Sequence, residues 1–313
     1  MKVIVTGATG FFGPGIVARL RDAGHEVIGA SRSGAAGSRL DITDPASCDA
    51  LLRFHRDAGA IVHAAALAHV PPGAGLVSQC QAVNVGGTRN LAAAAVAAGI
   101  PSFVFISSIT VYGDYDLPTA VTEETPARST STYGAAKRRA EELLAGFSAG
   151  TNLWVLRMAT MYSPGWIFNI RKRVSLPLFG QHGYFTLDPD GRRYSLCSRR
   201  NGAETVLRCV EGRIPPGTYN VADEYVYSQR DILRAVEAVE GRKRHLPIPV
   251  VLPRIAAMAA ALVPVPSIRE NARSRYWKFC ERNVYSSAKL AAFGVPLPPD
   301  LLSVGTPGQE ASV

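Results

Sequence analysis

Cysteine is scarce in this chain and has no paired spacing. Five cysteines are spread over 313 residues, and none forms the close Cys or His/Cys groupings that zinc and redox sites require. We therefore expect no metal site and a reducing compartment. The chain opens on MKVIVTG, where strand residues begin without a basic and apolar leader, which predicts a cytoplasmic protein. The cysteines are Cys48, Cys80, Cys197, Cys209 and Cys280.

Long hydrophobic runs are also missing. The most apolar late stretch, residues 255–265, is too short to cross a bilayer and is closed by Pro264 and Pro266. We expect a buried or interface helix there and no membrane partner.

Acidic residues are the minority, with 25 Asp and Glu against 34 Lys and Arg and a net charge of +9. Such an excess fits a nucleic acid, a membrane surface or a phosphorylated small molecule, and charge alone does not choose among them. Basic residues interleaved with aromatic ones occur only at 273–278, so no nucleic-acid partner is expected.

The first half of the chain alternates short apolar runs with helical patterns. Such alternation is typical of βαβ units around a parallel sheet that is buried on both faces. The sequence therefore predicts an α/β protein with a doubly wound parallel sheet, the Rossmann arrangement. The expected strands are 2–6, 26–30, 60–62, 103–107 and 152–157, and the expected helices are 14–23, 76–98 and 131–147.

The texture of the sequence changes after Pro164. Gly, Pro and Arg become frequent, and the strand and helix alternation is lost until 218–221 and 228–239. We expect a dinucleotide-binding domain at 1–164 and a smaller, mainly substrate-binding C-terminal domain at 165–313, with some segments returning to the first sheet.

A glycine-rich loop lies between the first strand and the first helix. TGATGFFG, residues 6–13, carries Gly7, Gly10 and Gly13. The first glycine permits a tight turn, the second lets the backbone approach a pyrophosphate, and the third lets the helix pack on the strand. This context predicts a dinucleotide site.

The end of the second strand bears on the choice of cofactor. A carboxylate that would accept ribose hydroxyls is absent there, and Ser31, Arg32 and Ser33 stand in its place. Because Arg32 can pair with a 2′-phosphate and the serines can donate to it, NADP is favoured over NAD. Asp41 and Ile42 are candidates for contacts to the adenine.

A tyrosine and a lysine stand four residues apart in the helix expected at 131–147. Tyr133 and Lys137 share one helix face, where a lysine ammonium would lower the pKa of the phenol and make it a usable acid or base. Ser108 ends a buried strand at the carboxyl edge of the sheet and could bond the same substrate oxygen. The charges that follow, Arg138, Arg139, Glu141 and Glu142, are interpreted as a solvated helix face.

The order and spacing of these motifs resemble the extended short-chain dehydrogenase/reductase family, which includes nucleotide-sugar epimerases, dehydratases and 4-ketosugar reductases. The resemblance covers nearly the whole chain. It is carried by TGATGFFG, Asp41-Ile42, HAAA (63–66), NVGGTRNL (84–91), SSITVYG (107–113), YGAAK (133–137), LRMATMYSPG (156–165) and GTYNVA (217–222).

The resemblance implies a role for each matching residue. Ser108 would orient a carbonyl, Tyr133 would exchange the proton, and Lys137 would bind the nicotinamide ribose and tune the phenol. Further cofactor contacts would come from Gly7, Gly10, Phe11, Phe12, Gly13, Ala64, Ala65, Ala66, Asn84 and Ser107. Substrate contacts would come from His69, Ser108 and Asn169. Arg193 and Arg269 are further candidates for a different reason: the second domain is basic, and guanidinium groups can bind the phosphates of a nucleotide diphosphate.

The family contains several reactions. Hexose dehydratases carry an acidic pair after the active serine, where this chain has Ile109 and Thr110, so water elimination lacks its acid and base. An NADPH-dependent 4-keto-6-deoxysugar reductase is favoured, and a nucleotide-diphosphate-hexose 4-epimerase that keeps NAD bound is the alternative. A non-catalytic dinucleotide sensor would be a different class. We expect a homodimer joined through the helices at 76–98 and 131–147.

Overall fold

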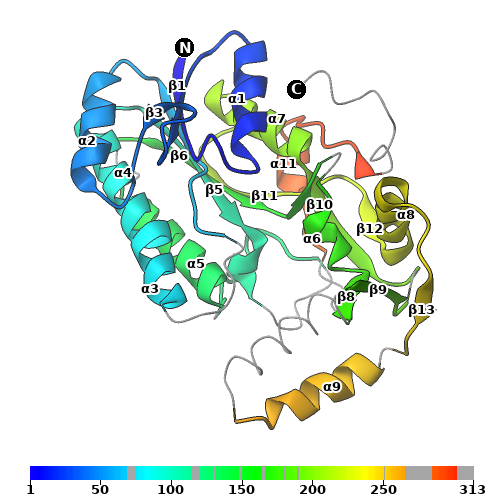
Figure 1. Cartoon of the computed structure of the whole chain (residues 1–313). Coiled ribbons are helices and arrows are strands. Elements are labelled where there is room, and N and C mark those ends of the chain that lie inside the picture. Colours follow the sequence, from blue (N-terminus) through cyan, green and yellow to red (C-terminus); the bar gives the residue numbers. More distant parts are fainter. Residues whose placement is uncertain are drawn as a thin grey trace.

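A parallel β-sheet forms the centre of the molecule. The computed structural model describes residues 1–68, 75–113, 120–129, 131–147, 150–163, 166–178, 181–188, 190–249, 251–264 and 284–301. Within these ranges, seven parallel strands pair in the order β11-β6-β5-β4-β1-β2-β3 (Figure 1). They are β1 (Lys2–Thr6), β2 (Glu26–Ser31), β3 (Gly37–Arg39), β4 (Ala60–His63), β5 (Ser102–Ser108), β6 (Asn152–Met158) and β11 (Gly217–Val221).

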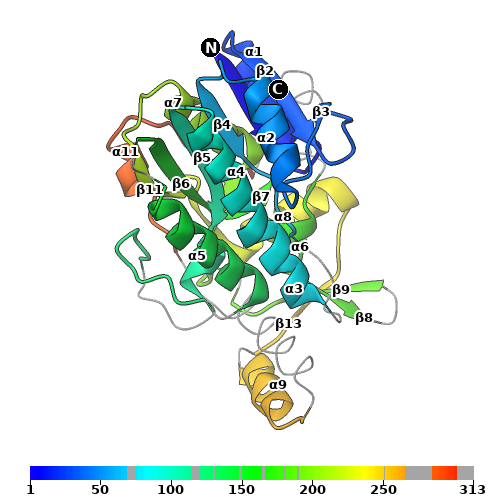
Figure 2. The same cartoon turned by 90° about the vertical axis from the view of Figure 1, so that its left-hand side faces the viewer.

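Helices cover both faces of this sheet, as the doubly wound prediction requires (Figure 2). Continuous apolar runs make this possible because their side chains are buried on either side of the strand. One core cluster packs α1 (Gly13–Asp22) and α7 (Arg199–Val210) on the sheet. The other packs α2 (Pro45–Phe54), α4 (Gly87–Ala97) and α5 (Thr132–Ala145). The predicted fold class is confirmed.

The helix expected at 76–98 has three parts. The α-helix α3 (Leu76–Cys80) continues into a π-helical stretch, Gln81–Gly86, and then into α4. A stretch of this kind often marks a functional position, and Asn84 lies within it.

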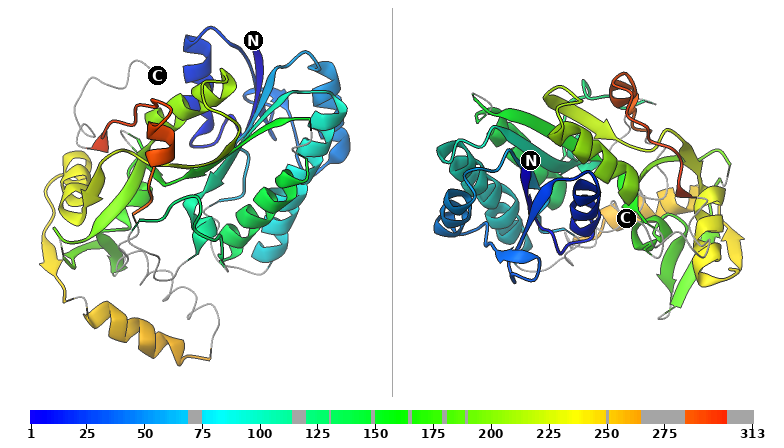
Figure 3. Two further views of the ribbon diagram at one scale, coloured as in Figure 1. Left: turned by 180° about the vertical axis from the view of Figure 1, so that it is seen from behind. Right: turned by 90° about the horizontal axis from the view of Figure 1, so that it is seen from above.

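The second half of the chain builds smaller sheets beside the first (Figure 3). The strands β7 (Thr160–Tyr162), β10 (Arg193–Ser198) and β12 (Val226–Ser228) form one sheet, and β8 (Ser175–Leu178), β9 (Gln181–Thr186) and β13 (His245–Pro247) form another. The helices α6 (Phe168–Arg171), α8 (Gln229–Glu240) and α11 (Ala288–Ala291) complete this region. The strand predicted at 218–221 is β11, and it pairs with β6 in the central sheet. The boundary at residue 164 stays a prediction.

The apolar stretch near residue 255 forms α9 (Val251–Ala261), which stands apart from the body (Figure 1). The side chains of Val251, Leu252, Ile255 and Met258 are exposed, so the helix is not buried within this chain. The alternative, an interface helix, stays a prediction. Among the described residues, no helix has both the length and the apolar character that a bilayer crossing needs.

Candidate active site

The glycine loop joins β1 to α1 as expected. Gly7 has φ +70°, and a Cβ there would lie 2.6 Å from the backbone nitrogen of Ala65. A Cβ on Gly13 would lie 2.3 Å from the carbonyl oxygen of Gly7, so α1 can begin this close to β1 only with glycine. Around Gly10 only that same carbonyl oxygen comes near, at 3.3 Å. Backbone atoms therefore crowd Gly7 and Gly13, whereas the space around Gly10 is more open.

The loop after β4 is held by Asn84. Its side-chain oxygen accepts from the Leu67 amide at 2.7 Å, and its amide nitrogen donates to the Leu67 carbonyl at 3.1 Å. The three alanines that precede Leu67 line this loop and are half-buried. Asn84 thus fixes the strand end that faces Gly7, and direct contacts of these residues with a cofactor stay a prediction.

His63 is buried where β4 ends. Its ring nitrogens contact Thr6 Oγ1 at 2.8 Å and Thr88 Oγ1 at 3.0 Å. Burial, with a smaller contribution from the positive charge of Lys137, lowers the pKa of His63 to about 3. The ring is therefore neutral at physiological pH and joins three elements of the fold.

The end of β2 is basic. Arg32 is exposed, and Ser31 is paired in the sheet with Arg39 on β3, so two guanidinium groups belong to this corner. The Asp41 carboxylate accepts from the Thr43 amide and hydroxyl, at 2.9 and 2.7 Å. These bonds, together with the nearby arginines, lower the pKa of Asp41. The sequence analysis missed Arg39, which the pairing of β2 with β3 brings here.

Ser131 caps the helix that carries Tyr133. Its side chain accepts from the Gly134 amide at 3.2 Å, which starts α5 one residue before Tyr133. A Cβ on Gly134 would lie 2.5 Å from the Thr110 carbonyl oxygen, so glycine lets the first turn of α5 pack directly on the backbone that follows Ser108. This contact brings the elements that carry Tyr133 and Ser108 together.

Lys137 lies one turn further along α5 and is buried. Its Nζ donates to the Ile106 carbonyl at 2.7 Å and lies 4.5 Å from the centroid of the Phe105 ring. Burial lowers the pKa of Lys137 to about 8. Both partners belong to β5, so the lysine ties α5 to the strand that ends at Ser108.

The expected effect of Lys137 on the phenol is wrong for this structure. Burial raises the pKa of Tyr133 to about 12, and no described hydrogen bond joins the two side chains. The ammonium is directed at the β5 carbonyl, so desolvation dominates at the phenol. Tyr133 is consequently a protonated phenol at neutral pH.

The two serines at the end of β5 differ in their contacts. Ser108 is half-exposed, and its hydroxyl accepts from the Thr110 amide at 3.2 Å and from the Thr110 hydroxyl at 3.0 Å. It caps the short 3₁₀ helix Ile109–Tyr112 while its own proton remains available for donation. Ser107 is buried and donates its hydroxyl to Glu141. A contact of Ser107 with a cofactor stays a prediction.

Aromatic rings close over the glycine loop. Trp166 is stacked on Phe11 with ring centroids 3.8 Å apart, and the Arg199 guanidinium carbon lies 5.8 Å from the centroid of the Phe11 ring. Trp166 and Arg199 lie in the second half of the chain. Nothing in the sequence distinguished Trp166 from other aromatic residues there, or Arg199 from other arginines. The structure thus brings both residues onto Phe11 of the glycine loop.

The predicted substrate residues are dispersed. Asn169 is half-buried on α6, and Arg193 is exposed at the start of β10, where its charge contributes to lowering the pKa of Asp190. His69 and Arg269 lie outside the described residues. Arg173, which the sequence did not single out, donates to Thr160 Oγ1 at 3.0 Å and brings a cation to the strand that follows β6.

The chain is similar to known enzymes over most of its length. It is 28% identical over 262 residues to the UDP-glucose 4-epimerase of Vibrio cholerae, which covers 80% of this chain and 79% of that enzyme. The structure of the Thermus thermophilus UDP-glucose 4-epimerase in complex with NAD superposes with a TM-score of 0.69 at 24% identity, covering 95% of this chain and 94% of that one. A dTDP-4-dehydrorhamnose reductase from Clostridium acetobutylicum superposes with a TM-score of 0.70 at 19% identity, covering 97% and 96%.

The family itself follows from the sequence. The sequence model of the NAD dependent epimerase/dehydratase family matches residues 3–179, more than half of the 313 residues. This span runs from β1 through the glycine loop, Ser108, Tyr133 and Lys137 to β8. The chain therefore belongs to the NAD dependent epimerase/dehydratase family, the extended short-chain dehydrogenase/reductase enzymes that its motifs resemble.

Proposed function

We propose that this enzyme reduces a 4-keto-6-deoxysugar carried on a nucleotide diphosphate, with NADPH as the hydride donor. The packing of Gly134 on the Thr110 carbonyl carries the proposal, because it brings Tyr133 and Lys137 to the strand end where Ser108 lies. These residues meet at the carboxyl edge of the sheet, beside the glycine loop, where ligands bind in doubly wound folds.

The protonation state of Tyr133 supports the reductive direction. A phenol with a pKa of about 12 holds its proton at neutral pH and can donate it to the carbonyl oxygen as that oxygen gains charge. Ser108 donates a second hydrogen bond to the same oxygen. Lys137, whose Nζ donates to the Ile106 carbonyl, would bind the nicotinamide ribose. When bound, a reduced nicotinamide cofactor would supply the hydride that the carbonyl carbon needs for reduction to an alcohol.

The basic corner at the end of β2 supports NADPH. The Asp41 carboxylate is engaged by Thr43, and Arg32 and Arg39 offer the forked donors that bind a 2′-phosphate. Arg173 beside Thr160 is a donor for the diphosphate of the substrate.

Elimination of water is not favoured. The two residues after Ser108 are Ile109, which is buried, and Thr110, whose hydroxyl donates to Ser108. Neither residue has a carboxylate. An acid and a base for a dehydratase would have to come from elsewhere.

A 4-epimerase with tightly bound NAD is the second candidate, and the similarity to the Vibrio cholerae UDP-glucose 4-epimerase favours it. Such an enzyme removes a hydride and returns it to the other face of the sugar, so it consumes no cofactor. The stacked rings over the glycine loop would suit retention of a cofactor.

One assay separates the candidates. Purified protein is given UDP- or dTDP-4-keto-6-deoxysugar with NADPH or NADH, and the absorbance of the reduced cofactor is followed. We expect loss of NADPH absorbance with wild-type protein and none with Tyr133→Phe. Interconversion of UDP-glucose and UDP-galactose without added cofactor, with no ketosugar reduced, would establish the epimerase instead. Cofactor binding without either reaction would indicate a dinucleotide sensor.

The assembly we propose is a homodimer that pairs the outer faces of α4 and α5. A shallow apolar depression lies between these helices, lined by Ala92, Ala95, Val96, Leu144 and Phe147, among others. Light scattering of the purified protein should give twice the chain mass, and Val96→Glu should shift it to the monomer.

A further inference from the structure

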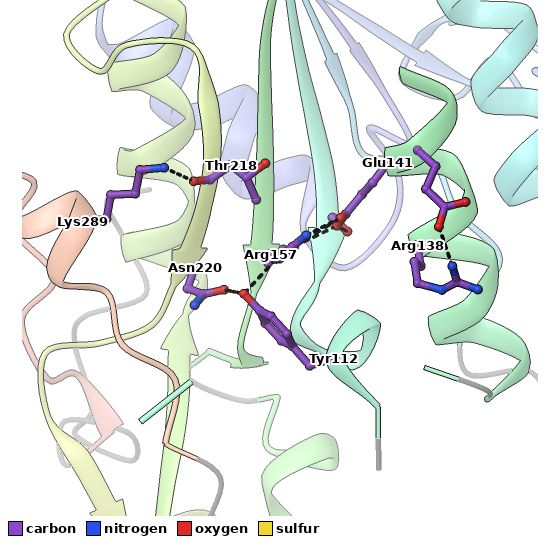
Figure 4. A network of polar contacts seen from close by, with 9 residues as sticks. Tyr112, Arg138, Glu141, Arg157, Thr218, Asn220 and Lys289 are labelled. Carbon is purple, nitrogen blue, oxygen red and sulfur yellow. Dashed lines mark hydrogen bonds and ion pairs between the residues drawn. The ribbon is translucent and has the colours of Figure 1, made fainter. Parts of the chain in front are cut away.

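Glu141 does not lie on a solvated helix face as its charged neighbours do. Its side chain is 10% exposed, as is that of Arg157 on β6. Arg157 Nη2 lies 2.7 Å from one carboxylate oxygen of Glu141, and Arg157 Nε lies 3.2 Å from both (Figure 4). The spacing explains the burial, because Glu141 is four residues beyond Lys137 and shares its face of α5.

Two adjacent residues of β5 hold two adjacent turns of α5. The Ile106 carbonyl accepts from Lys137 Nζ, and the Ser107 hydroxyl donates to Glu141. Ser108 is the next residue along the strand. The position of Tyr133 and Lys137 relative to Ser108 therefore depends on these two contacts together with the packing of Gly134.

The contact at Glu141 continues across the sheet. Arg157 Nη1 donates to the Tyr112 hydroxyl at 2.9 Å, and that hydroxyl donates to Asn220 Oδ1 at 2.7 Å (Figure 4). The backbone N–H of Asn220 donates to the Glu123 carboxylate at 2.7 Å. Buried polar networks whose members are all paired hold their elements rigidly, and this one joins α5, β6, β11 and the 3₁₀ helix after Ser108.

We propose that Glu141 is a positioning residue for the reaction: with Ser107 and Arg157 it fixes α5 against β5, and its carboxylate, one helical turn from Lys137, favours the charged form of that buried lysine. Only the expected effect on kcat rests on the proposed function. Burial lowers the pKa of Lys137 and Glu141 opposes that shift, in keeping with the geometry.

Few other charges face Lys137 from the elements packed around it. His63 on β4 is neutral, Cys80 on α3 lies near Tyr133 with a pKa raised by burial, and Arg157 on β6 is paired with Glu141. Within the described part of the chain, Glu141 is the acidic group that acts on Lys137.

The test compares Glu141→Gln with Glu142→Gln, which removes the same charge from the exposed face of the same helix, where Glu142 pairs with Arg138 and Arg139. The titration of Lys137 is followed by NMR of protein labelled at the lysine Cε, with Lys137→Met assigning the signal. We expect wild type and Glu142→Gln to titrate near pH 8 and Glu141→Gln to titrate lower. An unchanged titration in Glu141→Gln would overturn the electrostatic role. This readout needs no substrate, so it stands even if the proposed reaction fails.

Kinetics test the positioning role. With any substrate that is turned over, Glu141→Gln should lose about tenfold or more in kcat while the Kd for the cofactor changes little. Ser107→Ala leaves the ion pair with Arg157 intact and serves where Glu141→Gln does not fold. We expect a fall in kcat of about threefold with only a small fall in Tm, since one buried hydrogen bond is lost. The positioning role of Glu141 would be overturned if Ser107→Ala kept the kcat of the wild type. It would also be overturned if the variant only bound the cofactor more weakly.

Discussion

Trp166 lies face to face on Phe11, with ring centroids 3.8 Å apart and an angle of 24° between the ring planes. Phe11 belongs to the glycine loop, so a residue from beyond the predicted domain boundary packs on the proposed phosphate site. The stack would have to open, or be lost, for a bound dinucleotide to leave past it.

Trp166→Ala should therefore speed the release of the cofactor. Aromatic pairs of this kind contribute about 0.5–1.5 kcal/mol, which corresponds to about a two- to tenfold faster dissociation. Stopped-flow displacement of NADPH or NADH measures the rate. Phe168→Ala removes the exposed neighbour of Trp166 and is the control. If the cofactor dissociates at the same rate from both variants, the stack of Trp166 on Phe11 does not retain the cofactor.

Tyr133→Phe should abolish turnover without loss of fold or cofactor binding. Among the described residues the Tyr133 phenolic oxygen has no hydrogen-bond partner, so its removal leaves no other group unpaired. We expect a fall in kcat of about 10²-fold or more, as for loss of a general acid. Cofactor affinity is measured by fluorescence titration. Substantial residual activity would mean that another group supplies the proton.

Arg32→Ala and Arg39→Ala should weaken NADPH far more than NADH. Each removes a donor for the 2′-phosphate, and we expect about a tenfold rise in the Kd for NADPH per arginine. Arg53→Ala, an exposed arginine on α2, is the control. If both cofactors weaken equally, the corner does not select for the extra phosphate, and NAD becomes the proposed cofactor.

His63 should make the folded protein sensitive to acid. Its pKa is lowered from 6.5 in the unfolded chain to about 3, so the unfolded state binds one more proton between these values. The free energy of unfolding that His63 contributes above pH 6.5 is then lost as the pH falls toward 3, by on the order of 5 kcal/mol. Urea unfolding at a series of pH values should show a shallower dependence for His63→Gln than for the wild type. His245→Gln, at an exposed position on β13, should keep the wild-type slope.

Local signals in the sequence predict much of the site. The glycine loop, the capping serine before α5 and the Tyr133–Lys137 spacing are all set within a few residues, and each lies where it was expected. Helix α2 was missed, although Asp44 and Pro45 form a typical start: the Asp44 side chain accepts from the Ala46 amide.

Contacts between distant segments could not be predicted in the same way. Trp166 on Phe11 and Arg39 beside Ser31 depend on how strands pair, which periodicity does not specify. Glu141 is different, because the spacing that aligns Tyr133 with Lys137 also aligns Glu141 with both. The burial of Glu141 could therefore be predicted from its spacing, but the neighbouring charged residues suggested a solvated helix face.

The return of β11 to the central sheet also bears on how the protein is made. This strand pairs with β6 along its length and comes from residues 217–221, well after the smaller sheets begin. During synthesis the central sheet cannot add β11 beside β6 until more than two thirds of these 313 residues have left the ribosome. A fragment ending near residue 164 would leave β6 as an unpaired edge and is expected to aggregate. We therefore expect the two halves of the chain to fold as one unit.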